Sequence, residues 1–377
     1  MAPTYPRLNA RKAVRWTHLW LGIIGGAFVC LMSVTGAIVT LRPQIAEWMS
    51  PASPQPAGCA GPVDWNRAEQ QLRSYGHDEI NRIYAFADGD PRYHVRIRTS
   101  RPAIYTHAIY DVCAGQVLGS IDLAWMDWTV DLHHNLLAGK AGRMWAGVIG
   151  IAFLISGLSG LTLWLLGRRR VSTAFRVQWE GSAARLSRDL HRAIGLGAAC
   201  VLLLEAYTGL WLCFPQAMRA TLGMVASVPE EARPARAPKP KAAAPQAGLA
   251  AMMASARQAI PDGVVREVRL PDGYGNVQVR MRRAGDFRSL GNNVVTVENA
   301  GATVVGIDRY ADKSGALRFV QAMPGLHYGE WGGLGMRLLY AAAGLATVLL
   351  FASGLVIWLR PTARVRMKVR ALASIES

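Results

Sequence analysis

Four long apolar segments constrain the fold of this 377-residue chain. Each is about 20 residues long and nearly free of charge, which is the length that an α-helix needs to cross roughly 30 Å of hydrocarbon. The first segment is too long for a cleaved signal peptide, and it runs into TLRPQ rather than a small-residue cleavage site. We therefore expect a membrane protein with a bundle of four transmembrane helices. The segments are residues 19–41, 145–166, 194–214 and 338–359.

The formal net charge of +17 is concentrated in three segments. Residues 1–18, 167–192 and 360–377 hold sixteen basic residues against three acidic ones. Because all three lie on one side of a four-span topology, this is the positive-inside pattern, and it predicts a bacterial inner-membrane protein with both termini in the cytoplasm. The charge is therefore interpreted as a topology signal with some attraction to anionic lipid, and not as a nucleic-acid surface.

The apolar segments repeat in two registers. A shift of 173 positions places His18 on His191, and a shift of 194 places His133 on His327. We interpret the chain as a duplicated unit of apolar helix, polar region and apolar helix, and in such membrane repeats the functional site often lies at the repeat interface. The other matched positions are Gly22 with Gly195, Thr35-Gly36 with Thr208-Gly209, Arg143 with Arg337, Ser159-Gly160-Leu161 with Ser353-Gly354-Leu355, and Trp164 with Trp358.

Depth sorts the four histidines into two pairs. His18 and His191 begin helices that run outwards, so we expect both near the cytoplasmic face, whereas His133 and His327 lie near the periplasmic face. A single histidine at a membrane surface is usually a headgroup contact or a helix cap. Two imidazoles at one depth can instead hold the iron of haem b from opposite sides, an arrangement that suits electron transfer. The sequence therefore predicts two haem b groups, one for each pair.

Other polar residues near the helix ends are open to more than one interpretation. His134 is the alternative to His133, which is preferred because His134 aligns with Tyr328. Arg143 and Arg337 could pair with haem propionates or anchor helix ends at the headgroups. Glu205 lies inside the third apolar helix, where a carboxylate is a candidate proton or quinol contact. The alternative is a structural pairing with Tyr207 or with a neighbouring helix.

The second and fourth helices are expected to begin before the membrane, over residues 133–166 and 327–359. A continuous helix from His133 to Trp164 would be roughly 46 Å long at about 1.5 Å per residue, which exceeds the hydrocarbon thickness. The helix therefore either projects into the periplasm or bends near residues 138–142, and the second histidine pair lies at the outer surface. The first and third helices span residues 19–41 and 193–214.

Two polar regions, residues 43–132 and 215–326, share one plan and are expected in the periplasm. Each is predicted to be a small α+β module in which one helix precedes three or four antiparallel strands. The helices are predicted over 65–75 and 248–260. The strands are predicted over 83–87, 93–99, 104–112 and 116–121, and over 264–270, 276–282, 294–298 and 303–308.

The polar regions contain few further signals. Residues 229–246 are rich in proline and alanine and are predicted to be a linker. Cys59 and Cys113 share the first region, where an oxidising compartment permits a disulfide. Three histidines without metal-ligand spacing are interpreted as surface or substrate-contact residues: His77, His94 and His107.

These motifs resemble the PepSY-associated transmembrane family, whose members are often described as iron-regulated membrane proteins. The resemblance rests on RWTHLWLG, DLHRAIGL, the two LH pairs, the two TG pairs and the SGL…W endings, and because the outer regions resemble PepSY domains it covers nearly the whole chain. Within the family the chain looks most like FoxB-type ferrisiderophore reductases. That resemblance implies two haem b groups and delivery of electrons to a periplasmic ferric siderophore, with His18, His191, His133 and His327 as iron ligands.

The expected function is therefore that of a haem-dependent ferric-siderophore reductase that releases Fe(II) for iron uptake. No nicotinamide or flavin fingerprint is present, so a quinol or a cytoplasmic reductant is the expected electron donor. Two alternatives are a haem-free PepSY membrane protein that binds or regulates an envelope partner, and a permease component for siderophore or haem.

Overall fold

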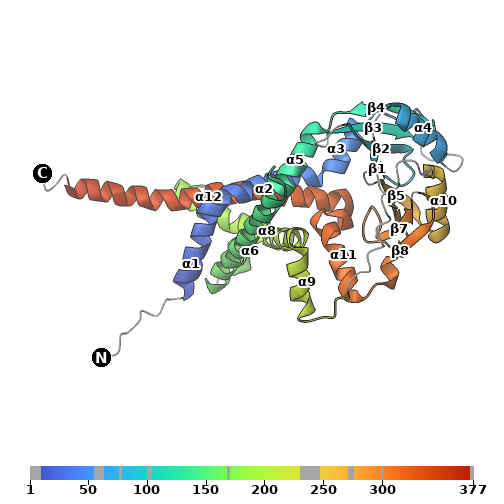
Figure 1. Cartoon of the computed structure of the whole chain (residues 1–377). Helices are drawn as coiled ribbons and strands as arrows, with labels where there is room; N and C mark the ends of the chain where they lie inside the picture. The colour runs from blue at the N-terminus through green and yellow to red at the C-terminus, as the bar shows by residue number, and fades with distance from the viewer. Residues whose placement is uncertain are drawn as a thin grey trace.

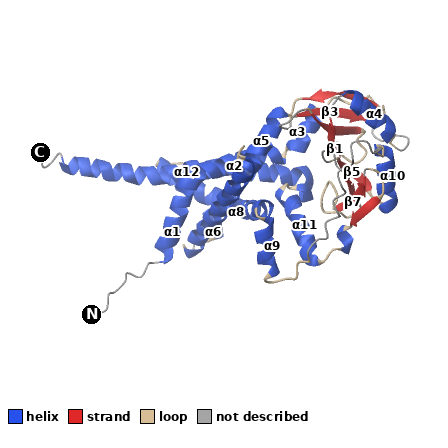
Figure 2. Ribbon diagram, in the orientation of Figure 1, coloured by secondary structure: helices blue, strands red, loops and turns tan. Residues whose placement is uncertain are grey.

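The computed structural model describes residues 10–54, 63–75, 79–99, 104–167, 170–229, 247–270, 276–298 and 300–373. The chain forms a helical part with a sheet domain at one end of it (Figures 1 and 2). Residues 230–246 of the predicted linker, Cys59 and His77 lie outside the described residues.

Four segments of the described chain are long and apolar enough to cross a membrane. Their outward side chains are large and apolar, and Leu345 and Leu349 are 54% and 57% exposed. Apolar surface of this extent on every long helix requires lipid around it, so the chain is a membrane protein. The segments are Ala10–Thr40, Gly139–Leu166, Ala183–Cys213 and Glu330–Arg360.

Each membrane helix packs against the next one in a closed ring. α8 packs against both α6 and α12, α12 packs against α2, and α1 packs against α6. Close approach depends on glycine, because a Cβ at Gly344 of α12 would lie 2.8 Å from the carbonyl oxygen of Ser33 in α2. The helices are α1 (Ala10–Trp20), the π-helix η1 (Leu21–Gly25), α2 (Gly26–Thr40), α6 (Gly139–Leu166), α8 (Ala183–Cys213) and α12 (Gly333–Ala373).

The expected helix over 133–166 is broken in two. α5 (Ala124–Asn135) ends where Leu136 and Leu137 take left-handed φ values of 48° and 58°, and α6 begins at Gly139. Each left-handed leucine costs about 1–2 kcal/mol. The chain turns so tightly here that no Cβ fits at Gly142, where it would overlap the carbonyl oxygen of Asn135. The turn therefore lies at the start of the 138–142 segment, and His133 belongs to a separate helix.

The segment predicted as helix 327–359 is also divided. α11 (Gly315–His327) ends at the histidine, a short 3-10 turn η3 (Glu330–Gly332) follows, and α12 then begins. Gly329 and Gly333 bracket this turn with φ values of 62° and 58°, which only glycine adopts without strain. α12 continues to Ala373, so the residues predicted as a basic tail extend the helix to that point.

Eight strands form one antiparallel sheet, in the order β4-β3-β2-β1-β5-β6-β7-β8. The sequence predicts a module in each polar region, and the structure joins their strands edge to edge through β1 and β5, where Ile83 pairs with Val268. The strands are β1 (Glu79–Ala85), β2 (Arg92–Arg98), β3 (Tyr105–Asp111), β4 (Gln116–Ile121), β5 (Val264–Arg269), β6 (Asn276–Arg282), β7 (Asn293–Glu298) and β8 (Val304–Asp308).

One face of the sheet packs on two helices, α4 (Trp65–Tyr75) and α10 (Leu249–Ala259). Both helices bury residues at helical spacing, and β6 buries every second residue, which is how amphipathic helices and a half-buried strand share one core. The buried residues are Trp65, Ala68 and Leu72 of α4, Leu249, Met252, Met253 and Ala256 of α10, and Val277, Val279 and Met281 of β6. We call this side of the sheet the outer face.

The opposite, inner face looks toward the membrane helices (Figure 1). Near β3 and β4 it is covered by α3 (Arg42–Met49) and α5, with Ile109, Leu123 and Met126 fully buried between them. At the other end α11 follows β8 after the 3-10 turn η2 (Tyr310–Asp312). Short helices α7 (Val171–Ala174) and α9 (Pro215–Gly223) flank α8 in the chain.

Candidate bis-histidine sites

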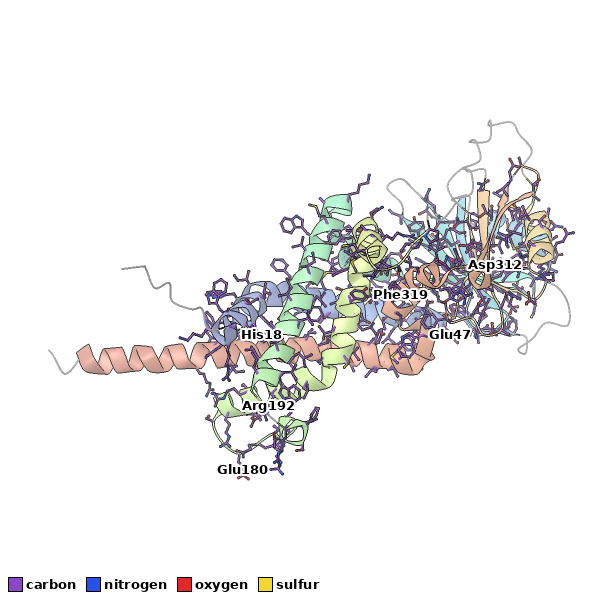
Figure 3. The ribbon with its side chains drawn as sticks, turned by 90° about the horizontal axis from the view of Figure 1, so that it is seen from below. His18, Glu47, Glu180, Arg192, Asp312 and Phe319 are labelled. Carbon is purple, nitrogen blue, oxygen red and sulfur yellow. The ribbon has the colours of Figure 1, made fainter. Side chains whose placement is uncertain are left out.

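His18 and His191 form a pair within the helical part, away from the sheet domain. His18 lies on α1 and His191 on α8, and their ring centroids are 6.1 Å apart with an interplanar angle of 83°. In Figure 3, His18 lies among the helices and Asp312 marks the sheet domain at the other end. We call these two residues the sheet-distal pair.

His133 and His327 form a second pair where the helical part meets the sheet domain. They stand at the ends of α5 and α11, and their ring centroids are 6.3 Å apart with an interplanar angle of 31°. We call them the sheet-proximal pair. The structure thus brings the four histidines together in the two pairs that the sequence predicts.

All four imidazoles are anchored in the same way through Nδ1. Each Nδ1 lies 3.0–3.1 Å from the hydroxyl of a serine or threonine on a neighbouring helix. Each also bonds the backbone carbonyl three residues before that hydroxyl. The sets are His18 with Ser159 and Ser156, His191 with Ser353 and Leu350, His133 with Thr35 and Met32, and His327 with Thr208 and Glu205.

These anchors determine which nitrogen is available to a metal. A carbonyl oxygen can only accept a hydrogen bond, so Nδ1 of each neutral imidazole carries the proton. Nε2 then keeps its lone pair, which is the form that binds a metal, and an Nδ1–H bond to a carbonyl is the usual support of a histidine ligand.

A glycine follows each anchoring hydroxyl and makes room for the ring. A Cβ at Gly36 would lie 2.9 Å from Cε1 of His133, and a Cβ at Gly160 would lie 2.9 Å from Cε1 of His18. The corresponding distances are 3.3 Å at Gly209 and 3.5 Å at Gly354. The Ser-Gly and Thr-Gly pairs, which the sequence shows only as repeat identities, are therefore the cradles of the four histidines.

The spacing of both pairs fits a shared metal. An imidazole nitrogen lies about 2 Å from the metal it binds, so two trans imidazoles place their ring centroids about 6 Å apart. Both observed separations match this value. Each pair offers two imidazoles, which is the number of protein ligands that the iron of haem b takes at a bis-histidine site.

A cavity surrounds the sheet-proximal pair. The space not filled by atoms is about 1140 Å³, part of which is open to the surroundings, and most of its lining is apolar. Both imidazoles line it, together with Gly36 and Gly209. Donors, spacing and cavity together fit a flat macrocycle between α2, α6 and α8.

The remaining sequence candidates take distinct positions. His134 lines the same cavity, but it is His133 that faces His327. Arg143 lines the cavity and donates to the carbonyl of Leu212 at the end of α8. Arg337 is only 7% exposed and donates to the carbonyl of Thr40 at 2.9 Å, which is a helix-anchoring contact.

Glu205 reaches the sheet-proximal pair from the membrane side. Its Oε2 lies 3.7 Å from Nδ1 of His327, and its Oε1 is buried without a hydrogen-bond partner among the described residues. His327 is thus the neighbour of Glu205 on another helix. Tyr207, the other candidate partner, is 37% exposed.

His94 and His107 are buried, which corrects their interpretation as surface or substrate-contact residues. They are 5% and 1% exposed, and Nε2 of His94 lies 2.8 Å from Nδ1 of His107. Nε2 of His107 in turn bonds Asp127 of α5 at 3.0 Å. Burial, and then the neighbouring positive charges, lower the pKa of His94 far below its ordinary value. His94 is therefore a neutral partner of His107, and His107 links the sheet to α5.

Asp127 is the ionised member of this network. Burial by itself raises the pKa of its carboxyl, but the hydrogen bond from His107 and the charges of Arg96 and Arg42 outweigh burial and lower the pKa. Arg42 approaches the carboxylate at 2.9 Å. The sequence carries only a weak signal for this network, because it shows His94 and His107 simply as histidines on predicted strands. The structure adds that α5 covers the inner face of these strands.

The cysteines divide between the helical part and the sheet domain. Cys113, at the end of β3, is disulfide-bonded, and Cys59 lies outside the described residues. Cys30, Cys200 and Cys213 of the membrane helices are free thiols.

The fold and the sites define a four-helix membrane protein with paired, identically anchored histidines and an extramembrane sheet. Residues 15–360 match the model of the PepSY-associated TM region, and the chain belongs to this family. It is also similar to an uncharacterized protein of Pseudomonas aeruginosa, with 29% identity over 270 residues that cover 65% of this chain and 67% of the relative.

Proposed function

We propose that the chain is a di-haem b oxidoreductase of a bacterial inner membrane that reduces ferric siderophores in the periplasm. The observation that supports it most is the fourfold use of one ligand arrangement, in two pairs with ring-centroid separations of 6.1 and 6.3 Å. A single anchored histidine is common, but this recurrence is expected of a chain that holds two similar metal groups.

The two histidine pairs would hold separate haem groups. His18 and His191 would hold one haem iron, and His133 and His327 would hold the other. Haem b held at these two positions would supply one-electron transfer across the membrane. The serine and threonine hydroxyls keep the Nδ1 protons in place, and the cavity offers a mostly apolar lining to the macrocycle.

The proposed orientation follows from charge. The helix ends away from the sheet domain carry the basic residues, and Figure 3 shows Arg192 and Glu180 at this end. The positive-inside rule favours the cytoplasm for it and the periplasm for the sheet domain. The proposed donor is therefore a quinol or a cytoplasmic reductant, and the proposed acceptor lies beside the sheet. Once Fe(III) is reduced, the hard oxygen donors of a siderophore hold the resulting Fe(II) far less tightly.

Haem content tests the first half of the proposal. Protein purified from haem-sufficient cells is expected to contain two haem b groups per chain and to show the narrow bands of six-coordinate haem after dithionite reduction. His18→Ala should lose one haem and His327→Ala the other. A colourless wild-type preparation would contradict the proposal and favour a haem-free binding protein.

Reoxidation tests the second half. Dithionite-reduced protein, freed of excess reductant, is expected to reoxidise when a ferric siderophore is added under argon, and a ferrous chelator should then trap Fe(II). If no ferric chelate reoxidises the protein, siderophore reduction is wrong even where both haems are present.

A further inference from the structure

Three arginines stand in one row across the middle of the sheet. The β1–β2 register sets Arg82 against Arg96, and the β1–β5 register sets Arg82 against Arg269. Like charges directly opposite one another on neighbouring strands destabilise a sheet. The row therefore costs folding free energy at the junction between the two halves of the sheet.

The row lies on the inner face, toward the membrane helices. Ile83 is next to Arg82 on β1, and Val268 is next to Arg269 on β5. Both are buried in the core of the outer face. Because side chains alternate along a strand, Arg82 and Arg269 project from the opposite face. On β3 the residue opposite Arg96 is His107, so the row continues to that strand. His107 in turn bonds Asp127 of α5.

Among the described residues, the arginines of this face outnumber the carboxylates that pair with them. Glu267, whose side chain is 4% exposed, accepts from Arg82 at 3.4 Å, Arg269 at 3.3 Å and Arg280 at 3.1 Å. One carboxylate thus serves three guanidinium groups. Two of these groups stay accessible, because the side chains of Arg82 and Arg269 are 31% and 37% exposed.

The same excess of positive charge extends toward α5. Arg96 lies 3.7 Å from Asp127, but Asp127 is already paired with Arg42 at 2.9 Å and with His107. The guanidinium of Arg96 also lies 3.6 Å from the centroid of the Tyr105 ring, a cation–π contact that fixes its position. The face is therefore a set of positioned arginines with donors to spare.

This face is connected to the sheet-proximal site through α5. Arg96 lies 3.7 Å from Asp127 of α5, and His133 lies six residues further along the same helix, about 9 Å away at about 1.5 Å per residue. An anion held near Arg96 would thus lie on the side of the sheet that carries the second histidine pair.

We propose that the arginine face, defined as Arg82, Arg96, Arg269 and Arg280, binds a polyanionic Fe(III) chelate with oxygen donors, such as a tris-catecholate complex. This inference rests on the proposed function for the identity of the metal, whereas the preference for an anion rests on the face itself. Positioned guanidinium groups favour oxyanions through charge-assisted and bidentate hydrogen bonds, and they gain nothing comparable from a neutral complex of similar size.

Gallium complexes separate binding from reduction, because Ga(III) matches Fe(III) in charge and size but is not reduced. The full-length protein, in nanodiscs of neutral phosphatidylcholine, is titrated with the trianionic gallium tris-catecholate and with a neutral gallium tris-hydroxamate. We expect the wild type to prefer the trianion, with an affinity that falls as salt rises.

Substitutions localise the site. The Arg82→Gln/Arg269→Gln double variant should bind the trianion about tenfold more weakly or worse. Arg269→Lys keeps the charge but loses the planar set of donors, so it should bind more tightly than the double variant and more weakly than the wild type. Arg257→Gln is the matched control, because Arg257 is exposed on α10 at the outer face. Haem spectra and thermal unfolding confirm that each variant is folded.

The outcomes distinguish this inference from the proposed function. Equal binding of the trianion by wild type and double variant, or equal affinity for the trianionic and neutral complexes, would overturn the arginine face and leave the haem result untouched. A colourless protein that still loses the trianion in the double variant would overturn the oxidoreductase and retain the anion site.

Discussion

The hydroxyl of Thr35 lies 3.1 Å from Nδ1 of His133 and donates its own proton to the carbonyl of Leu31 at 2.7 Å. It therefore accepts from the imidazole and helps to point Nε2 into the cavity. Thr35→Val keeps the shape and removes this bond, and the affinity of the sheet-proximal site for haem should fall about tenfold to a hundredfold. Haem transfer to apomyoglobin measures the change.

Thr162 provides the matched control for this substitution. Its hydroxyl donates to Leu158 at 2.7 Å within α6 and lies on the exposed side of that helix. Thr162→Val should leave both haems in place. Equal haem loss in the two variants would show that the Thr35 effect is one of helix packing.

The cradle glycines should differ in tolerance within one site. A methyl group at Gly160 would lie 2.9 Å from Cε1 of His18, whereas at Gly354 it would lie 3.5 Å from Cε1 of His191, an ordinary contact. Gly160→Ala should therefore displace His18 and lose or shift the sheet-distal haem, and Gly354→Ala should keep it. Optical spectra and haem-to-protein ratios decide, and the reverse order would contradict the described ring positions.

His133 and His134 should be separable by substitution. His133 faces His327 at 6.3 Å between ring centroids and has an anchored Nδ1. His133→Ala should lose the sheet-proximal haem, while His134→Ala should retain both haems with at most a small shift in potential. Loss of one haem in His134→Ala alone would transfer the ligand role to that residue.

Asp127 should stabilise the contact between α5 and the sheet in a pH-dependent way. Its pKa in the folded chain lies below the ordinary aspartate value of about 3.9, so its contribution is complete above about pH 4 and is lost as the pH falls through the folded value. At neutral pH, Asp127→Asn should cost about 1–3 kcal/mol, because Arg42 and Arg96 lose their carboxylate.

Thermal unfolding followed by circular dichroism, from pH 7 down to about pH 3, measures this dependence. The gap between wild type and Asp127→Asn should narrow in acid. Asp131→Asn is the control, since Asp131 bonds Asn135 on the exposed side of α5. A gap that is independent of pH would contradict an ionised Asp127 in the folded protein.

The features that the sequence predicts well are those set by local composition or by the repeat. Apolar runs long enough to span a membrane need no knowledge of their neighbours, and all four coincide with long helices. The offsets of 173 and 194 placed the four histidines in two pairs, because equivalent helices in two copies of a unit reach equivalent depths.

The features that the sequence misses depend on contacts between distant segments. Nothing in Leu136-Leu137 signals two left-handed residues, because leucine normally avoids that region. The pairing of Ile83 with Val268 joins strands from opposite halves of the chain, and strand patterning does not specify a partner. The roles of Ser159 and Thr35 become visible only once a histidine from another helix lies beside them.

The continuous sheet has a mechanical consequence for the second histidine pair. α5 follows β4 and α11 follows β8, and these strands are the two opposite edges of the sheet. The two helices that end near His133 and His327 therefore extend from opposite edges of one eight-stranded sheet (Figure 1). The separation of His133 and His327 therefore depends both on the sheet, which connects α5 and α11, and on α2 and α8, which hold the two rings through Thr35 and Thr208.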